Sequence, residues 1–303
     1  MFIKNVKFEK FTLGLMLASL VGLTACQATS HQVVTKTAIS QTSSEYQHIR
    51  NATAKIEYAG KTFLIDPYLA EKGRYAGFEG TVNSEKRNPL IDMKQSIDEV
   101  IKGVDAIIVT HTHADHWDEV AQTRLPKDLP IFVQNAGDAR IIREQGFKDV
   151  RVLGKNTQFG DVLLSKTGGQ HGTDAMYAIP QVAEIAGDAM GVVFQARGEK
   201  TLYVVGDTIW NDDVNSALKH YRPDVLVLNT GYAQLKGFDG SLIMGTDDVA
   251  HAYKAVPHAQ IITVHMDAVN HATVSREQMR EFIKTHKFSD RVFVPAENDV
   301  IKF

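Results

Sequence analysis

Three histidines and one aspartate lie within six residues of this chain, at His111, His113, Asp115 and His116. Neutral imidazole and carboxylate groups are good ligands for zinc, manganese or iron. Local geometry cannot wrap all four groups around one ion, so a division between two ions is the natural solution. The cluster predicts a metal site, because a polar turn with solvated histidines explains so compact a motif less well.

Three more candidate ligands come later in the chain. His171 and Asp207 each follow an apolar stretch by a few residues, and His265 directly follows Ile261–Val264. In an α/β architecture the C-terminal ends of the strands form one edge, where ligand sites gather. Each residue alone would be explained as a structural histidine or a turn aspartate. Their common placement favours one site shared with the histidine cluster.

Alternating strands and helices are predicted to position these residues. Segments Ala54–Tyr58 and Thr62–Asp66 flank an Ala-Gly turn and predict a β-hairpin. Short apolar runs rich in β-branched residues predict further strands at Val104–Val109, Ile131–Val133, Val192–Gln195, Leu202–Val205, Val225–Leu228, Ile261–Val264 and Val292–Val294.

Four helices are predicted from apolar residues at helical spacing and from helix-end signals. Ser275 and Gln278 form a capping-box pattern before the last of them, and Gly146 closes the first. The four helices are expected at Asp138–Gln145, Val214–Tyr221, Val249–Val256 and Met279–His286.

Residues 71–92 are rich in glycine and charge and predict a long loop, a type of segment that often serves as a functional lid. Two polar residues near the predicted strand ends are weaker site candidates. Asp66 either orients a ligand histidine or forms the turn before Pro67. His271 either contacts a substrate or lies in a surface loop.

The composition limits the class of protein. The chain has 303 residues, 44% of them hydrophobic, and a net charge of −3. These values exclude a disordered chain, a coiled coil and a collagen-like fibre. No basic excess is available to neutralise phosphates, so no nucleic-acid partner is expected. The single cysteine, Cys26, excludes an intramolecular disulfide, and a metal site in the folded part must use histidines and carboxylates.

The first 26 residues have the pattern of a bacterial lipoprotein signal. Three lysines within the first ten residues precede a mostly apolar stretch, Phe11–Leu23, which is too short to span a bilayer comfortably. The sequence Leu23-Thr24-Ala25-Cys26 resembles the lipobox, in which the chain is cut before the cysteine and the thiol of Cys26 is lipidated. A plain secretory signal with a chance cysteine is the alternative.

Three parts of the chain are therefore expected. Residues 1–25 are the signal peptide, residues 26–48 are the lipidated cysteine with a flexible tether, and residues 49–303 are the folded domain. The tether is rich in Ser, Thr and Gln. Gln27 stands where an aspartate would favour retention in the inner membrane. The expected location is the bacterial cell envelope, with the lipid anchor in the outer membrane and the domain facing the periplasm.

The seven candidate ligands resemble the signature of the metallo-β-lactamase superfamily, which is HxHxDH followed by His, Asp and His on later strand ends. All seven positions are filled, and the resemblance spans about residues 50–303. The stretches Leu64–Pro67 and Gly206–Thr208 resemble the branch that contains the L-ascorbate-6-phosphate lactonase and the N-acyl-phosphatidylethanolamine phospholipase D. The resemblance implies an α/β fold, a four-layer αββα sandwich of two mixed sheets with helices outside.

The same resemblance implies two divalent metal ions, with zinc expected and manganese or iron as alternatives. The first ion would be bound by His111, His113 and His171, the second by Asp115, His116 and His265, and both by Asp207. A hydroxide held between the ions would be the nucleophile, since two cations lower the pKa of bound water. Asp115 would also act in catalysis, by orienting the nucleophile or by moving a proton to the leaving group.

These features predict a metal-dependent hydrolase that cleaves an ester, lactone or phosphodiester bond in a small-molecule or lipid substrate. A phospholipase-like activity on membrane lipids is the alternative, because the anchor holds the domain beside them. A metal-binding lipoprotein without turnover is a third hypothesis, against which the complete ligand set argues. A diiron oxygen reductase would be expected to have a glutamate in place of His113, whereas a mononuclear iron dioxygenase stays open on the ligands alone.

Overall fold

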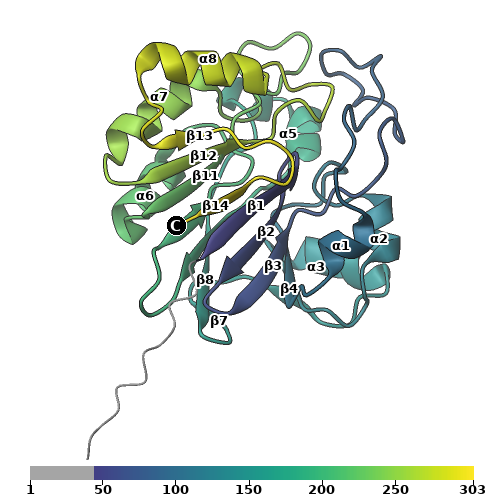
Figure 1. The fold of residues 1–303 in the computed structure, drawn as a ribbon. Helices are drawn as coiled ribbons and strands as arrows, with labels where there is room; N and C mark the ends of the chain where they lie inside the picture. The colour runs from purple at the N-terminus through teal and green to yellow at the C-terminus, as the bar shows by residue number, and fades with distance from the viewer. Residues whose placement is uncertain (1–43) are drawn as a thin grey trace, which may run out of the picture. The chain divides into compact units, whose positions relative to one another are not determined.

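Two seven-stranded mixed sheets form the centre of the fold of residues 44–303, the part of the chain that this computed structural model describes (Figure 1). In the first sheet the strands β14, β1, β2 and β3 pair antiparallel, and β3 to β6 pair parallel. Its strands in spatial order are β14 (Val300–Lys302), β1 (Glu45–Arg50), β2 (Thr53–Tyr58), β3 (Lys61–Ile65), β4 (Ala106–Val109), β5 (Ile131–Val133) and β6 (Val150–Val152).

The second sheet repeats this division into an antiparallel and a parallel half. Strands β7 to β10 pair antiparallel, and β10 to β13 pair parallel. Its strands in spatial order are β13 (Val292–Phe293), β12 (Gln260–Val264), β11 (Val225–Asn229), β10 (Leu202–Val204), β9 (Gly191–Gln195), β8 (Val162–Thr167) and β7 (Thr157–Phe159).

Helices cover the outer face of each sheet. Three pack on the first sheet, namely α1 (Ile97–Ile101), α2 (Glu119–Arg124) and α3 (Ala136–Glu144). Three pack on the second sheet, namely α6 (Asp212–Tyr221), α7 (Thr246–Ala255) and α8 (Arg276–His286). The short helices α4 (Asp174–Tyr177) and α5 (Pro180–Ala186) follow one another in the connection between β8 and β9.

The core consists of three apolar layers that alternate with the sheets. The central layer lies between the sheets and contains Phe63 and Phe194, whose rings meet edge to face with centroids 5.2 Å apart. One outer layer joins Ile107 of the first sheet to Ile142 of α3. The other outer layer joins the second sheet to α6, α7 and α8. This arrangement confirms the αββα sandwich, because each sheet buries both of its faces.

All four predicted helices form, each within a few residues of its expected bounds. They are α3, α6, α7 and α8, and Ser275 and Gln278 cap α8 reciprocally as predicted. The pattern missed α1, α2, α4 and α5, which have only four to seven residues each. Such short helices bury one apolar residue each, so they leave little periodic signal.

The first strand begins earlier than the expected domain boundary. Residues 45–48 were expected in the tether, but residues 45–47 pair with both β2 and β14, and His48 pairs with β2. Polar residues such as His48 and Arg50 are buried in this strand, so its apolar alternation is weak. Cys26, the predicted signal peptide and the predicted tether up to residue 43 lie outside the described residues. None of the helices in residues 44–303 combines the length and the apolar content needed to cross a bilayer.

Gly206 allows the turn that follows β10, and a side chain there is expected to be costly. Its φ is +77°, and an added Cβ would collide with the carbonyl oxygen of Met190. Gly146 also has a positive φ, of +93°, but faces open space. We expect Gly206→Ala to lower the free energy of unfolding by about 2–5 kcal/mol and Gly146→Ala by about 1–2 kcal/mol. Urea denaturation measures both, and equal losses would contradict the steric argument.

Candidate metal centre

The structure brings all seven candidate ligands together at the carboxyl ends of the strands. The histidine cluster follows β4, His171 follows β8, Asp207 follows β10 and His265 follows β12. Strands β4 and β8 belong to different sheets, so the site lies where the edges of the two sheets meet. The potential ligand atoms form three overlapping groups, each within 4.8 Å, whose members are His111, His113 and His171; His111, His116 and Asp207; and Asp115, His116 and His265.

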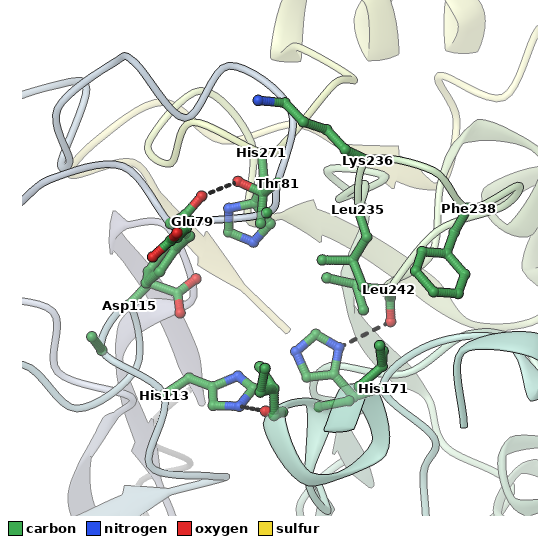
Figure 2. Close-up of a pocket in the computed structure, with 16 residues that line it drawn as sticks. Glu79, Thr81, His113, Asp115, His171, Leu235, Lys236, Phe238, Leu242 and His271 are labelled. Atoms are coloured by element: carbon green, nitrogen blue, oxygen red, sulfur yellow. Dashed lines mark hydrogen bonds between the residues drawn. The ribbon is translucent and has the colours of Figure 1, made fainter. Parts of the chain in front are cut away.

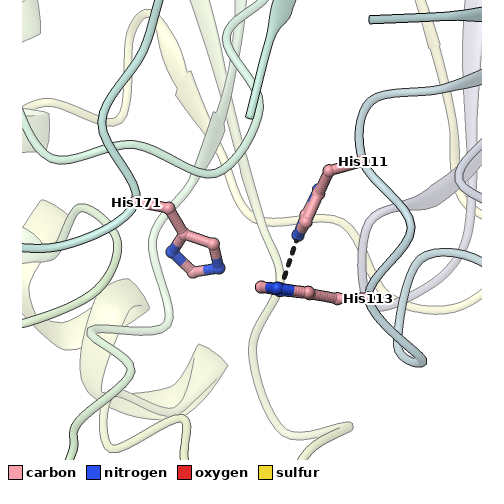
Figure 3. A group of neighbouring side chains, drawn as sticks. All are labelled: His111, His113 and His171. Carbon is pink, nitrogen blue, oxygen red and sulfur yellow. Dashed lines mark hydrogen bonds between the residues drawn. The ribbon is translucent and has the colours of Figure 1, made fainter. Parts of the chain in front are cut away.

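The first group consists of three imidazole rings that face one another (Figure 3). The Nε2 atom of His111 lies 3.0 Å from the Nδ1 atom of His113. The Nε2 atom of His171, on the opposite side, lies 3.4 Å from a carboxylate oxygen of Asp207. The group of Asp115, His116 and His265, called the second group from here on, lies beside the first. There the Nε2 atoms of His116 and His265 are 3.0 Å apart.

Asp207 lies between the two groups. Its Oδ2 atom is 3.1 Å from Nε2 of His116 and 3.4 Å from Nε2 of His171. The same oxygen is 3.6 Å from His265 and 4.0 Å from His111. Its other oxygen, Oδ1, accepts a hydrogen bond of 2.5 Å from the side-chain amide of Asn229. One carboxylate oxygen is therefore held by the protein, and the other faces rings of both groups.

The hydrogen bonds on the outer side of the rings show that this site fits metal ions. The Nδ1 atom of His116 lies 2.9 Å from Oδ2 of Asp66, and Nδ1 of His171 lies 3.1 Å from the carbonyl oxygen of Leu242. These oxygens only accept, so the outer nitrogens donate, and the inner nitrogen of a neutral ring presents a lone pair. The same holds for His113, whose Nε2 lies 2.8 Å from the Ile185 carbonyl oxygen. At His116, burial lowers the pKa, but the carboxylates of Asp207, Asp115 and Asp66 outweigh it and raise the pKa well above its usual value, so a metal ion there would take the place of a proton.

As a result, ring nitrogens and carboxylate oxygens lie 3–4 Å apart inside the site, with few protons between them. Such a set is favourable only when a cation binds among the lone pairs, and outer hydrogen bonds of this type are typical of metal-binding histidines. Burial also lowers the pKa of His171 to about 4 and that of His111 well below its usual value. Both rings are therefore neutral at pH 7, which is the form that binds metal.

Asp66 has the orienting contacts that were one of its two predicted roles. Besides His116, it accepts hydrogen bonds of 2.7 Å from the backbone amide and the hydroxyl of Thr110. Thr110 in turn lies 3.2 Å from Nδ1 of His111. One buried carboxylate thus fixes the outer side of rings in both groups, while its left-handed backbone, with φ of +43°, also forms the turn before Pro67.

Two buried amides at the site were missed by the sequence analysis. The side-chain nitrogen of Asn51 lies 3.1 Å from the backbone oxygen of Asp115 and 3.3 Å from Nε2 of His265. Asn229 holds Asp207, as described above. Asn229 ends an apolar strand beside the strand of Asp207, which was a usable signal. Asn51 lies in a turn of the hairpin between β1 and β2 and gave no signal.

An apolar pocket of about 480 Å³ opens onto the ligands (Figure 2). His113, Asp115 and His171 form part of its wall. His271 also lines it and is only 7% exposed, so the expectation of a surface-loop position for His271 is wrong. The apolar side chains of the pocket wall come from residues 71–92, from α5 and from the β11–α7 connection. They are Phe78, Val182, Ile185, Leu235, Phe238 and Leu242.

Comparison with known proteins agrees with the fold. The profile of the β-lactamase superfamily domain matches residues 61–266. The UPF0173 protein YddR of Bacillus subtilis is 46% identical over 255 residues, which cover 84% of this chain and 98% of that protein.

Two solved structures are also similar. A possible metal-dependent hydrolase from Veillonella parvula is 50% identical, with a TM-score of 0.85, over 86% of this chain and 100% of the other. An isothiocyanate hydrolase from Delia radicum gut bacteria is 42% identical, with a TM-score of 0.83, over 86% of this chain and 99% of the other.

The fold, the ligand set and these similarities define the class of protein: the chain belongs to the β-lactamase superfamily and has the metallo-β-lactamase fold. Within that superfamily it belongs to the UPF0173 family, and it is a metal-dependent hydrolase.

Proposed function

We propose that this enzyme hydrolyses small, largely apolar electrophiles, with isothiocyanates as the first candidate, and that it uses two divalent ions, zinc in the first place. The observation that carries the proposal is the apolar pocket beside the histidines and aspartates. Pockets of this volume suit small molecules, and their apolar walls favour uncharged substrates.

The residues of the site suit this role. His111, His113 and His171 would hold one ion and Asp115, His116 and His265 the other, with Asp207 shared. When bound, such cations would lower the pKa of bound water and stabilise negative charge on the attacked group. Asp115 lines the pocket and also belongs to the second group. Its position supports a role in which Asp115 would orient the attacking water and move a proton toward the leaving group.

Isothiocyanates suit the pocket by their chemistry. They are uncharged, and their central carbon, between nitrogen and sulfur, is electrophilic. Water adds its oxygen to this carbon, the carbon–nitrogen bond breaks, and both hydrogens of the water end on nitrogen. The products are an amine and carbonyl sulfide. The solved relative with 42% identity is an isothiocyanate hydrolase, which supports this candidate.

Esters and lactones are the second candidate, since an apolar pocket also accepts them and their carbonyl carbon is attacked in the same way. The resemblance to the lactonase branch is the reason to include a lactone among the candidate substrates. A phosphodiester is less favoured, because Lys236 is the one lysine or arginine that lines the pocket within residues 44–303, and Glu79 accompanies it. Arg87 donates to the backbone oxygens of Gly73 and Arg74 instead. A phospholipid is less favoured for the same reason.

A panel of substrates tests the proposal. The zinc-loaded chain is incubated with phenethyl isothiocyanate, a δ-lactone, a p-nitrophenyl ester, bis(p-nitrophenyl) phosphate and phosphatidylethanolamine vesicles. We expect amine release from the isothiocyanate to have the highest kcat/KM, with the lactone or ester next. Asp207→Ala, loaded in the same way, is the control. Fastest cleavage of the phosphodiester or the phospholipid would contradict the proposal, and so would no cleavage of the isothiocyanate, the lactone and the ester.

We further propose that Cys26 carries the lipid that holds the enzyme in the bacterial envelope. A multiply acylated cysteine anchors stably because its chains bury many CH₂ groups, whereas a serine or alanine carries none. We expect Cys26→Ala to lose lipid labelling and to leave the membrane fraction, with kcat/KM unchanged. Gln27→Ala is the matched control and should stay membrane-bound. Membrane association that is equal in Cys26→Ala and in wild type, with no lipid on the wild type, would contradict the anchor.

A further inference from the structure

His271 is a buried polar side chain in the pocket wall that belongs to none of the three ligand groups. Its side chain is almost completely enclosed, and its ring meets the ring of Phe78 edge to face, with centroids 5.0 Å apart. Figure 2 shows it lining the same space as Asp115 and His113. Since His271 lies six residues after His265, one segment supplies both a candidate ligand and this part of the wall.

The backbone around His271 is held firmly by its neighbours. The side-chain oxygen of Asn270 accepts hydrogen bonds from the backbone amide of Phe78, at 3.0 Å, and from the side chain of Asn88, at 2.7 Å. The backbone amide of Asn270 donates to Asn88 at 2.8 Å. The carbonyl oxygen of His271 accepts from the backbone amide of Gln234 at 3.1 Å. The long loop and the β11–α7 connection therefore fix the position of His271.

The two ring nitrogens of His271, by contrast, have no partner. Nδ1 is buried without a hydrogen bond, and no hydrogen bond joins Nε2 to another residue in the part of the chain that the structure describes. A buried polar group without a partner is destabilising, and such groups occur where function requires them. A neutral imidazole offers one N–H donor and one acceptor. The pocket is the space that is available for a partner.

We propose that His271 contacts the substrate directly and donates a hydrogen bond to the heteroatom bonded to the attacked carbon. In an isothiocyanate, nitrogen and sulfur are the heteroatoms that gain negative charge as the oxygen of water adds to the carbon. A donor that is fixed before the reaction stabilises this charge without reorganisation. The proposal rests on the proposed function of the same pocket, and it makes His271 a catalytic residue that binds no metal.

Two substitutions separate the hydrogen bond from the packing. His271→Phe keeps a ring against Phe78 and removes the donor, whereas His271→Gln loses the ring and keeps an N–H donor. His258→Phe is the matched control, because His258 is exposed and follows the end of α7 at Ala255. The full-length chain is loaded with zinc in each case, its zinc content is measured, and hydrolysis of phenethyl isothiocyanate is followed by amine release.

We expect His271→Phe to lower kcat by about 100-fold, with KM changed by less than about 3-fold and the zinc content unchanged. His271→Gln should recover at least about 10-fold of the lost kcat, and His258→Phe should match wild type. Wild-type kcat in His271→Phe, equal losses in the Phe and Gln variants, or loss of zinc in both would overturn the role of the hydrogen bond. A wild-type enzyme that does not cleave the isothiocyanate would instead overturn the proposed function, and with it this inference.

Discussion

Asp207→Ala is expected to lose both metal ions and to lower kcat/KM by at least about 1,000-fold. The reason is the position of its Oδ2 atom, which lies 3.1 Å from His116 and 3.4 Å from His171, members of different ligand groups. An imidazole offers one lone pair to one ion, whereas a carboxylate oxygen can serve two. The negative charge of Asp207 also offsets the repulsion between two cations about 3.5–4 Å apart.

His265→Ala is the matched contrast to Asp207→Ala. His265 belongs to the second group only, so its loss should chiefly weaken one ion and leave the ion among His111, His113 and His171. Titration with zinc measures the affinity of each variant, and circular dichroism shows that both are folded. If folded Asp207→Ala keeps two ions with wild-type affinity, Asp207 is not shared and the assignment to two groups fails.

Removal of the metal is expected to lower the thermal stability of the protein, which is the second large effect. The centre buries His111, His116 and Asp207 with their ligand atoms close together, and these atoms are held apart from water in the folded chain. An ion that binds only the folded state, present at 1,000 times its Kd, stabilises it by about 4 kcal/mol. For a domain of this size, we expect the thermal midpoint to rise by at least about 10 °C between the chelated and the zinc-loaded protein.

Asp207→Ala also serves as the control for this measurement. Zinc should change its midpoint by only a few degrees, about a third of the wild-type effect or less, because the shared ligand is missing. Equal shifts in wild type and in Asp207→Ala would mean that zinc stabilises the chain elsewhere. Calorimetry at one protein concentration and one ionic strength measures both proteins.

The ligand set could be predicted because its members carry local signals. His111 to His116 form a dense motif, and Asp207 and His265 come at the ends of strongly apolar strands. Parallel strands place such ends on one edge, so proximity follows from the architecture. The strands inside the sheets also carry a local signal. Strands β5, β9, β11 and β12 are almost entirely buried, so their sequences are short apolar runs that predict strands.

The residues around the ligands could not be predicted in this way. Asn51 reaches Asp115 and His265 from 64 and 214 residues away in sequence, and no local pattern encodes such a contact. The pocket wall combines residues 71–92 with α5 and with the connection that contains Leu235. His271 illustrates the difficulty, because a surface loop was one of its two predicted positions, whereas contacts of Asn270 and Gln234 hold its backbone inside. Specificity therefore depends on contacts that only the folded chain reveals.

Elemental analysis of the purified enzyme tests the central claim most directly. The protein is stripped with a chelator, reconstituted separately with zinc, manganese and iron, and freed of unbound metal before the metal content per chain is measured. The geometry of seven ligands in overlapping groups predicts close to two ions per chain with at least one of these metals. A folded protein that retains no metal, or at most one ion per chain, under all three conditions would contradict the two-metal account.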